Sequence, residues 1–303
     1  MKLSRRKFLA RSSVAAAAVT AATVLPQHTW AYPLKNAPGL QLYSVGAPLT
    51  KDVSGTLSQV RAIGYTQVET AGFANLTAKE FRKALDAAGL RCHSSHLDFF
   101  KTQDLGPLFD DAHTVGAHYA VSAILLPEGS HPANVNSALF QRKLDDYKRV
   151  AANANRIALN AKQAGLQYAY HNHNYEFIDL GNGQIGYDVL LKETDPELVK
   201  FELDCGWMVM GGRDPVDYFR RYPNRYKMIH VKDFVPGTQE RPMVDMQMQG
   251  TRLGSGVINY KPIFAAAKKI GIDYYYLEPQ PPLAGTAPFQ AVKIDFDYLR
   301  DMQ

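Results

Sequence analysis

Short apolar runs alternate with longer amphipathic segments from residue 40 to residue 300. The short runs predict buried strands, and segments whose apolar residues recur every three or four positions predict helices packed against them. The expected strands span residues 40–45, 66–70, 91–96, 118–125, 166–170, 199–204, 226–230 and 274–278. The expected helices span residues 53–63, 77–88, 105–115, 138–164, 187–192, 262–270 and 291–300, and a further helix begins at Pro215.

Eight strand-helix alternations follow one another with no Gly/Ser linker and no change of composition. Residues at the helix ends support this pattern. In the helix predicted at 77–88, Thr77 and Glu80 have the spacing of a capping box, and Gly89 ends the helix. We therefore predict a single (β/α)₈ TIM barrel over residues 32–303. An open doubly wound sheet is the alternative, but Tyr43-Ser-Val-Gly46 is not the glycine-rich turn that such a sheet shows after its first strand.

The first 31 residues have the pattern of an export signal. Ser4-Arg5-Arg6-Lys7-Phe8-Leu9 is followed by a short, alanine-rich apolar stretch and a small-residue cleavage site after Ala31. The arginine pair resembles the twin-arginine type, whose pathway exports folded proteins. We expect a periplasmic protein that meets the Tat export machinery and has no stable membrane anchor after cleavage, because the apolar stretch is too short.

This leader accounts for the basic balance of the chain, which has 34 Lys and Arg against 29 Asp and Glu. Five of the basic residues and none of the acidic ones lie in residues 1–31, so the mature chain is neutral. A protein that grips phosphate backbones normally carries a basic excess, which disfavours nucleic acid as a partner. The two cysteines, Cys92 and Cys205, lie in apolar segments far apart and are expected to be buried free thiols.

Polar residues cluster where the predicted strands end, and in a barrel these ends converge on one face. They are Tyr43, Glu69, His96, His171 with His173 and Glu176, Asp204, His230 with Lys232 and Asp233, and Glu278. So many buried charges would be unfavourable if they stayed unpaired. A divalent cation resolves this, because carboxylates and neutral imidazoles are ligands for manganese, magnesium, cobalt or zinc.

Six motifs in this order resemble the sugar phosphate isomerase/epimerase family, also called xylose-isomerase-like barrels. They are Leu40-Gln-Leu-Tyr43, Gly64-Tyr-x-x-Val-Glu69, Tyr170-His-Asn-His173 with Glu176-Phe177, Leu203-Asp204, His230-Val-Lys-Asp233 and Leu277-Glu278-Pro279. The resemblance extends from about residue 40 to residue 299.

The resemblance implies one divalent metal, with Mn²⁺ as the first expectation and Mg²⁺, Co²⁺ or Zn²⁺ as alternatives. Its ligands end strands five to eight, which by position gives Asp204, His230 and Glu278. The family's strand-five glutamate falls at His171, and we expect this histidine to be the fourth ligand, with Glu176 as the alternative.

Such a metal favours removal of a proton beside a carbonyl through an enediolate. Glu278 is the expected base, Glu176 or His173 the second proton carrier, and Lys232 the group that stabilises the oxyanion. Four further residues are expected to bind the substrate: Tyr43, Glu69, His96 and Trp207.

The expected function is a metal-dependent sugar isomerase or epimerase. Its substrate is expected to be an unphosphorylated sugar or keto-sugar, because the strand ends show no cationic cradle for phosphate and the leader indicates export. The alternatives are a 3-keto-glycoside lyase or hydratase and a non-catalytic periplasmic carbohydrate-binding barrel. An apurinic-site endonuclease of this fold is disfavoured by the neutral charge. The oligomeric state stays open, a homodimer included.

Overall fold

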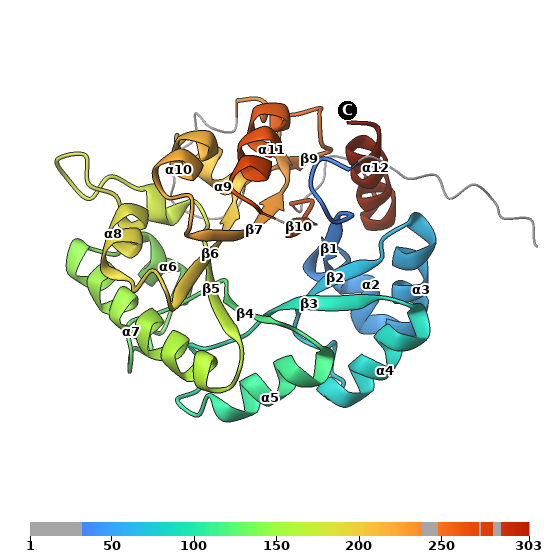
Figure 1. The fold of residues 1–303 in the computed structure, drawn as a ribbon, viewed down its shortest axis with the longest axis horizontal. Coiled ribbons are helices and arrows are strands. Elements are labelled where there is room, and N and C mark those ends of the chain that lie inside the picture. The colour runs from blue at the N-terminus through green and yellow to red at the C-terminus, as the bar shows by residue number, and fades with distance from the viewer. Residues whose placement is uncertain (1–31, 238–247, 273, 281–285, 303) are drawn as a thin grey trace, which may run out of the picture. The chain divides into compact units, whose positions relative to one another are not determined.

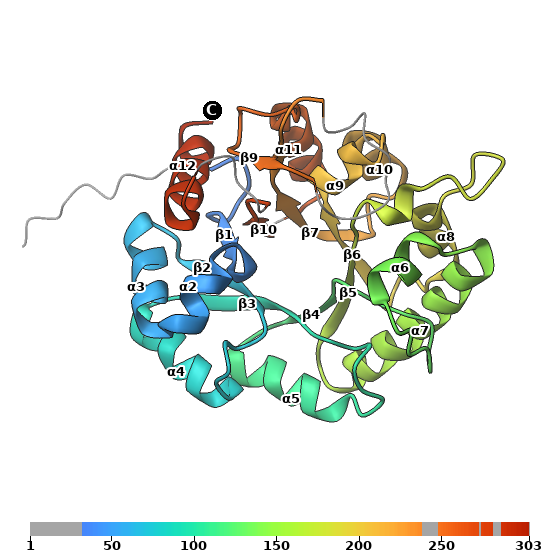
Figure 2. The ribbon, with the colours of Figure 1, turned by 180° about the vertical axis from the view of Figure 1, so that it is seen from behind.

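Eight parallel strands form a closed barrel in the computed structural model, which describes residues 32–237, 248–272, 274–280 and 286–302. The barrel strands are β1 (Gly39–Gln41), β2 (Gln67–Ala71), β3 (Arg91–His96), β4 (Tyr119–Ser122), β5 (Gln167–His171), β6 (Val199–Asp204), β7 (Tyr226–Val231) and β10 (Tyr274–Leu277). Their order around the ring is β1-β10-β7-β6-β5-β4-β3-β2. Figures 1 and 2 show these strands at the centre and the helices around them. The predicted TIM barrel is confirmed.

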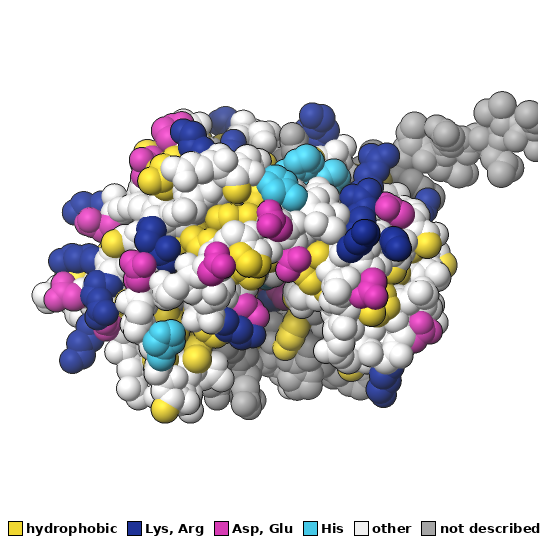
Figure 3. Space-filling model, turned by 90° about the horizontal axis from the view of Figure 1, so that it is seen from below, with side chains coloured by type: hydrophobic (Ala, Val, Ile, Leu, Met, Phe, Trp, Pro, Cys, Tyr) yellow, Lys and Arg dark blue, Asp and Glu magenta, His cyan; other side chains and the backbone are white. Residues whose placement is uncertain are grey.

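Helices follow the strands and cover the outside of the barrel. They are α2 (Gly46–Lys51), α3 (Val53–Ile63), α4 (Ala78–Ala88), α5 (Gly106–Val115), α6 (Val135–Phe140), α7 (Leu144–Gln163), α8 (Gly186–Glu193), α9 (Cys205–Met210), α10 (Pro215–Arg221), α11 (Tyr260–Lys269) and α12 (Pro288–Asp301), with 3₁₀ turns η1 (Leu42–Val45) and η2 (Tyr175–Phe177). After β7 a small antiparallel pair forms from β8 (Asp233–Phe234) and β9 (Gly250–Thr251). On the side seen in Figure 3, basic and acidic side chains are interspersed.

The local signals in the sequence explain several of these boundaries. The capping box of α4 is present, since Thr77 Oγ1 accepts the N–H of Glu80 and the Glu80 carboxylate accepts the N–H of Thr77. Gly89 then ends α4 at φ +68°, a conformation that glycine adopts without strain. Strand β6 is buried along its whole length although it carries Glu202 and Asp204, so these carboxylates point into the barrel rather than to solvent.

Three predicted elements are wrong in their extent. The strand predicted at residues 118–125 is the shorter β4, Tyr119–Ser122. The strand predicted at residues 40–45 ends at Gln41, whose side chain accepts the N–H of Tyr43 and starts the η1 turn. The helix predicted at 138–164 is two helices, α6 and α7. Between them the backbone is extended at Lys143, whose N–H donates to the Asp146 carboxylate and starts α7, and the buried side chain of Arg142 donates to the Leu125 carbonyl.

The predicted leader, residues 1–31, lies outside the described residues. None of the helices in the described part of the chain is both long and apolar enough to span a membrane. Cys92 and Cys205 are buried free thiols, as expected.

Candidate active site

A cavity of about 920 Å³ opens at the carboxyl ends of the barrel strands. Seven of the residues singled out from the sequence line it: Tyr43, His96, His171, His173, Trp207, Lys232 and Glu278. Asp204, His230 and Glu69 are fully buried directly beneath its floor. Glu176 and Asp233 do not line it. Asp233 instead accepts backbone N–H groups of the loop between β9 and α11, including that of Gly256, and so has a structural role.

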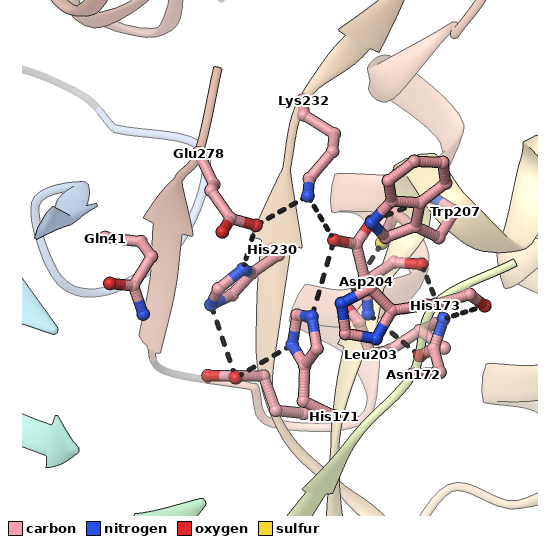
Figure 4. Close-up of polar contacts among 12 residues, drawn as sticks. Gln41, His171, Asn172, His173, Leu203, Asp204, Trp207, His230, Lys232 and Glu278 are labelled. Atoms are coloured by element: carbon pink, nitrogen blue, oxygen red, sulfur yellow. Dashed lines mark hydrogen bonds and ion pairs between the residues drawn. The ribbon is translucent and has the colours of Figure 1, made fainter. Parts of the chain in front are cut away.

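The four predicted metal ligands lie together. His171 ends β5, Asp204 ends β6, His230 is on β7 and Glu278 follows β10, and one potential ligand atom from each lies within 4.8 Å of all the others. His171 Nε2 is 3.7 Å from Asp204 Oδ2, and His230 Nδ1 is 3.0 Å from Glu278 Oε2 (Figure 4). We call these four residues the upper cluster.

A second layer of charged groups lies beneath the upper cluster. Glu202 Oε2 is 2.9 Å from His96 Nε2 and 3.1 Å from His171 Nδ1. Glu69 Oε2 is 3.1 Å from His96 Nε2 and 2.5 Å from His230 Nε2. His171 and His230 therefore each present one ring nitrogen to the upper cluster and the other to a carboxylate below. Such a carboxylate fixes the orientation and the tautomer of a metal-binding histidine.

Strand irregularities occur at both carboxylates of this lower layer. The register of β2 against β3 shifts between Val68 and Glu69, and that of β6 against β7 shifts between Phe201 and Glu202. A bulge of this kind re-aims the side chain beside it and is frequent next to active sites. The two irregularities thus direct Glu69 and Glu202 toward the histidines.

Lys232 bridges two members of the upper cluster. Its Nζ lies 2.8 Å from Asp204 Oδ2 and 2.5 Å from Glu278 Oε2, and 5.2 Å from the centre of the Trp207 ring. The path of its stem depends on Gly206, because a Cβ there would come within 2.4 Å of Lys232 Cγ. Burial would lower the pKa of Lys232, but Asp204 and Glu278 raise it above its ordinary value, so the amine is charged.

The histidines differ in their protonation. Burial and the nearby His230 lower the pKa of His171 well below its usual range, so its ring is neutral, as a metal ligand must be. Burial would also lower the pKa of His230, but the facing carboxylates of Glu202 and Glu69 raise it well above its usual range. The same two carboxylates, against the effect of burial, raise the pKa of His96 to about 10.

His173 is neutral and faces the cavity. Burial, followed by the charge of Lys232, lowers its pKa to about 3, and its Nδ1 has no hydrogen-bond partner among the described residues. Glu176 is not brought to the upper cluster: its carboxylate accepts hydrogen bonds from the Tyr170 hydroxyl at 2.7 Å and from the His173 N–H at 2.9 Å. Burial raises the pKa of Glu176 to about 7. Its contacts indicate that it positions the loop carrying His173.

Three site residues escaped the sequence analysis. Gln41 donates to Glu69 at 2.7 Å and lines the cavity. Asn172 joins β5 to β6, since its side chain accepts the N–H of Asp204 and donates to the Asp204 carbonyl. Glu202 is the third, and side-chain alternation could have found it, because it lies two residues before Asp204 on β6 and so shares its face.

The upper cluster fits a divalent cation. Two imidazoles and two carboxylates form a mixed nitrogen and oxygen donor set that suits manganese, cobalt or zinc. Four fully or almost fully buried carboxylates meet here: Glu69, Glu202, Asp204 and Glu278. Lys232 is the one lysine that pairs with them among the described residues, and Glu202 Oε1 has no hydrogen-bond partner in the same set. Without a cation, protons on His96 and His230 balance this charge.

Residues 57–302 match the family described as the xylose isomerase-like TIM barrel. The chain belongs to this family. This xylose isomerase-like barrel is 26% identical over 260 residues to an inosose dehydratase of Lacticaseibacillus casei, covering 77% of this chain and 84% of the relative. It is also 26% identical over 271 residues to an inosose dehydratase of Geobacillus thermodenitrificans, covering 81% and 88%.

Among solved structures, a sugar phosphate isomerase/epimerase from Parabacteroides distasonis superposes with a TM-score of 0.69 at 31% identity, covering 88% of this chain and 94% of that one. The resemblance drawn from the strand-end motifs is therefore confirmed. The chain is a xylose isomerase-like barrel of a family of sugar-modifying enzymes, and its relatives include both dehydratases and isomerases or epimerases.

Proposed function

We propose that this protein is a metal-dependent lyase that acts on an unphosphorylated keto-sugar, removing the proton beside the carbonyl and expelling the oxygen substituent from the next carbon. The observation that carries the proposal is the position of the carboxylates. Of the two carboxylates in the upper cluster, Glu278 lines the cavity and Asp204 does not. Glu176 is hydrogen-bonded to the Tyr170 hydroxyl and to the His173 N–H instead.

One carboxylate at the reacting carbon suffices for elimination. Epimerisation of the two-base type needs an acid or base on each face of the substrate, and at strand five this chain has His171, whose two nitrogens face Glu202 and Asp204. The similarity to inosose dehydratases supports elimination as well.

The upper cluster would hold the cation, with Mn²⁺ as our first expectation, and the cation would supply polarisation of the substrate carbonyl. Glu278 accepts the proton from the carbon beside the carbonyl, and the bond between the next carbon and its oxygen substituent breaks. The departing oxygen takes up the proton held by Glu278, either directly or through the neutral His173 ring, which accepts a proton at one nitrogen as it donates from the other, so the reaction consumes no net proton. Lys232 orients Glu278 and balances negative charge that develops at the carbonyl oxygen.

The test is product analysis by NMR in D₂O with purified protein and Mn²⁺. The panel contains 3-keto-glucosides, keto-inositols and simple ketoses. We expect an unsaturated or deoxygenated ketone together with released water or aglycone, and loss of this product in Glu278→Gln. In Glu176→Gln we expect elimination to persist, slowed by less than about tenfold, because this residue positions a loop.

An isomerase or epimerase is the second candidate, favoured by the 31% identity to the Parabacteroides distasonis protein. In that case the proton returns to carbon, and the same spectra would contain an isomeric or epimeric sugar with deuterium at the new centre and no released substituent. Binding of sugars without any exchange or product would instead indicate a carbohydrate-binding barrel and contradict both enzymatic proposals.

A further inference from the structure

The cavity has two sides of different chemistry, and the order of the strands explains why. In the ring, β4, β3 and β2 lie opposite β10, β7 and β6. The charged upper cluster comes from β5, β6, β7 and β10. The opposite side is lined by Phe73 after β2, Leu97 after β3, Leu108 on α5 and Ile124 after β4. We call these four residues the apolar wall.

The apolar wall is held in place by the packing behind it. Phe73, Leu108 and Ile124 are partly buried and pack against buried hydrophobic clusters, and the Phe73 ring lies 5.7 Å from that of Phe81. Leu97 is 7% exposed. Hydroxyl groups pressed against such a surface would lose hydrogen bonds to water, whereas an apolar group would gain by leaving water. This side of the cavity therefore favours an apolar part of a ligand.

The cavity is also larger than the reacting sugar requires. Its volume of about 920 Å³ lies near the upper end of the range in which drug-sized ligands bind, roughly 300–1,000 Å³. A single sugar ring placed at the upper cluster is much smaller than such ligands and leaves the apolar wall uncovered. A second unit attached to the sugar would cover it.

The charges along the cavity disfavour an anionic second unit. Lys232 is the one lysine or arginine among the described residues that line the cavity, and it is paired with Asp204 and Glu278. Asp98 and Asp111 line the side of the apolar wall, and Asp98 is paired with the exposed Lys101. A phosphate or carboxylate there would meet Asp111 without a free cation to balance it.

We propose that the substrate is an uncharged glycoside with an apolar, preferably aromatic, aglycone that lies against the apolar wall while its oxidised sugar ring lies at the upper cluster. This proposal rests on the proposed function for the reaction of the sugar ring. The aglycone is then the oxygen substituent that the elimination releases, and the proton balance is the one given above.

The first test measures binding without turnover. Mature protein purified after export is titrated calorimetrically, in the presence of Mn²⁺, with the unoxidised methyl, phenyl and 4-carboxyphenyl glucosides in both anomeric forms. We expect the phenyl glucoside to bind about 10- to 100-fold more tightly than the methyl glucoside, because the ring leaves water against the wall. We expect the carboxyphenyl glucoside to lose most of that advantage.

Leu108→Gln is the variant that tests the wall, since glutamine keeps the helical propensity of α5 and adds a polar group. It should reduce the preference for phenyl over methyl to less than about threefold while the methyl affinity stays unchanged. Leu159→Gln is the matched control, because Leu159 lies on α7, is 48% exposed and does not line the cavity. Ile124→Gln serves as the second wall variant if Leu108→Gln does not melt cooperatively.

The outcomes separate the two proposals. Three results would overturn the aglycone site. They are equal affinities for phenyl and methyl glucosides, no binding of either glucoside, and a preference for phenyl that survives both wall variants. If the preference for phenyl over methyl depends on the wall and no 3-keto-glucoside undergoes elimination, the aglycone site is retained and the proposed lyase reaction is rejected. Elimination that is equally fast from methyl and phenyl 3-keto-glucosides would retain the lyase and reject the aglycone site.

Discussion

Replacing Glu202 by glutamine should weaken metal binding while the barrel stays folded. Glu202 Oε2 lies 3.1 Å from His171 Nδ1 and 3.3 Å from His230 Nε2. These are the nitrogens turned away from the upper cluster. A carboxylate in this position keeps the proton on the far nitrogen and leaves the near one free for the metal.

The expected loss follows from what glutamine can still do. Its amide oxygen is neutral and accepts a weaker hydrogen bond than a carboxylate does, and its NH₂ group cannot accept a hydrogen bond from an imidazole N–H. Loss of a carboxylate that supports a metal-binding histidine typically weakens affinity 10- to 100-fold. His96 and His230 keep the carboxylate of Glu69, at 3.1 and 2.5 Å, so His171 is the ring that loses its carboxylate partner in the lower layer. We therefore expect the lower part of this range, about 10- to 30-fold, which is about 1.4 to 2 kcal/mol.

The assay is calorimetric titration of metal-free protein with Mn²⁺, repeated with Co²⁺ so that the visible spectrum reports coordination. Glu176→Gln is the matched control, because Glu176 is equally buried, undergoes the same change and contacts Tyr170 and the His173 backbone instead. Its Kd should stay within about twofold of the parent. Wild-type affinity in Glu202→Gln would refute the supporting role, and a large loss in Glu176→Gln would make Glu176 the fourth ligand, which the sequence left as the alternative.

Three further predictions concern stability, the lysine and export. Burial raises the pKa of Asp295 to about 7, so its contribution to stability is present below its unfolded pKa of 3.8 and is lost as the pH rises through 7. In chemical denaturation, Asp295→Asn should therefore raise the free energy of unfolding by on the order of 2–4 kcal/mol at pH 8 and by little at pH 4; equal effects at both pH values would contradict this. Gly206→Ala should displace Lys232, lower kcat/KM for elimination about 100-fold and lower the melting temperature, because the added methyl group overlaps a buried side chain; full activity would show that the lysine has another path. Changing both Arg5 and Arg6 to Lys should leave folded protein in the cytoplasm on cell fractionation, and unchanged periplasmic delivery would reject the twin-arginine signal.

The fold and the upper cluster could be predicted because both depend on local patterns. Short apolar runs mark the strands, and the carboxyl ends of parallel barrel strands meet on one face whatever the details of packing. Asp204 and His230 could thus be assigned to one site although 26 positions separate them. The lower layer was only partly found. Glu69 was noticed at the end of its run, while Glu202 stood inside a run that otherwise looked like buried strand.

The orientation of Glu176 could not be predicted from the sequence. It lies five positions past His171, in a loop, and nothing local states which way its carboxylate turns. The direction is set by tertiary partners, the Tyr170 hydroxyl and the buried cation of Arg142, which approaches from the break between α6 and α7. The sequence analysis predicted a continuous helix across that break, so it gave no sign that Arg142 lies near Glu176.

The histidine that ends β5 connects this packing to the choice of reaction. A carboxylate at that position could bind the metal through one oxygen and still accept a proton through the other. The neutral ring of His171 has two nitrogens, one 3.1 Å from Glu202 and the other facing Asp204 across 3.7 Å, so neither is left for the substrate. In the proposed reaction, a proton taken by Glu278 goes to the departing oxygen directly or through the neutral His173 ring. The residue type at the end of one strand is therefore the feature on which our proposal of elimination over epimerisation depends.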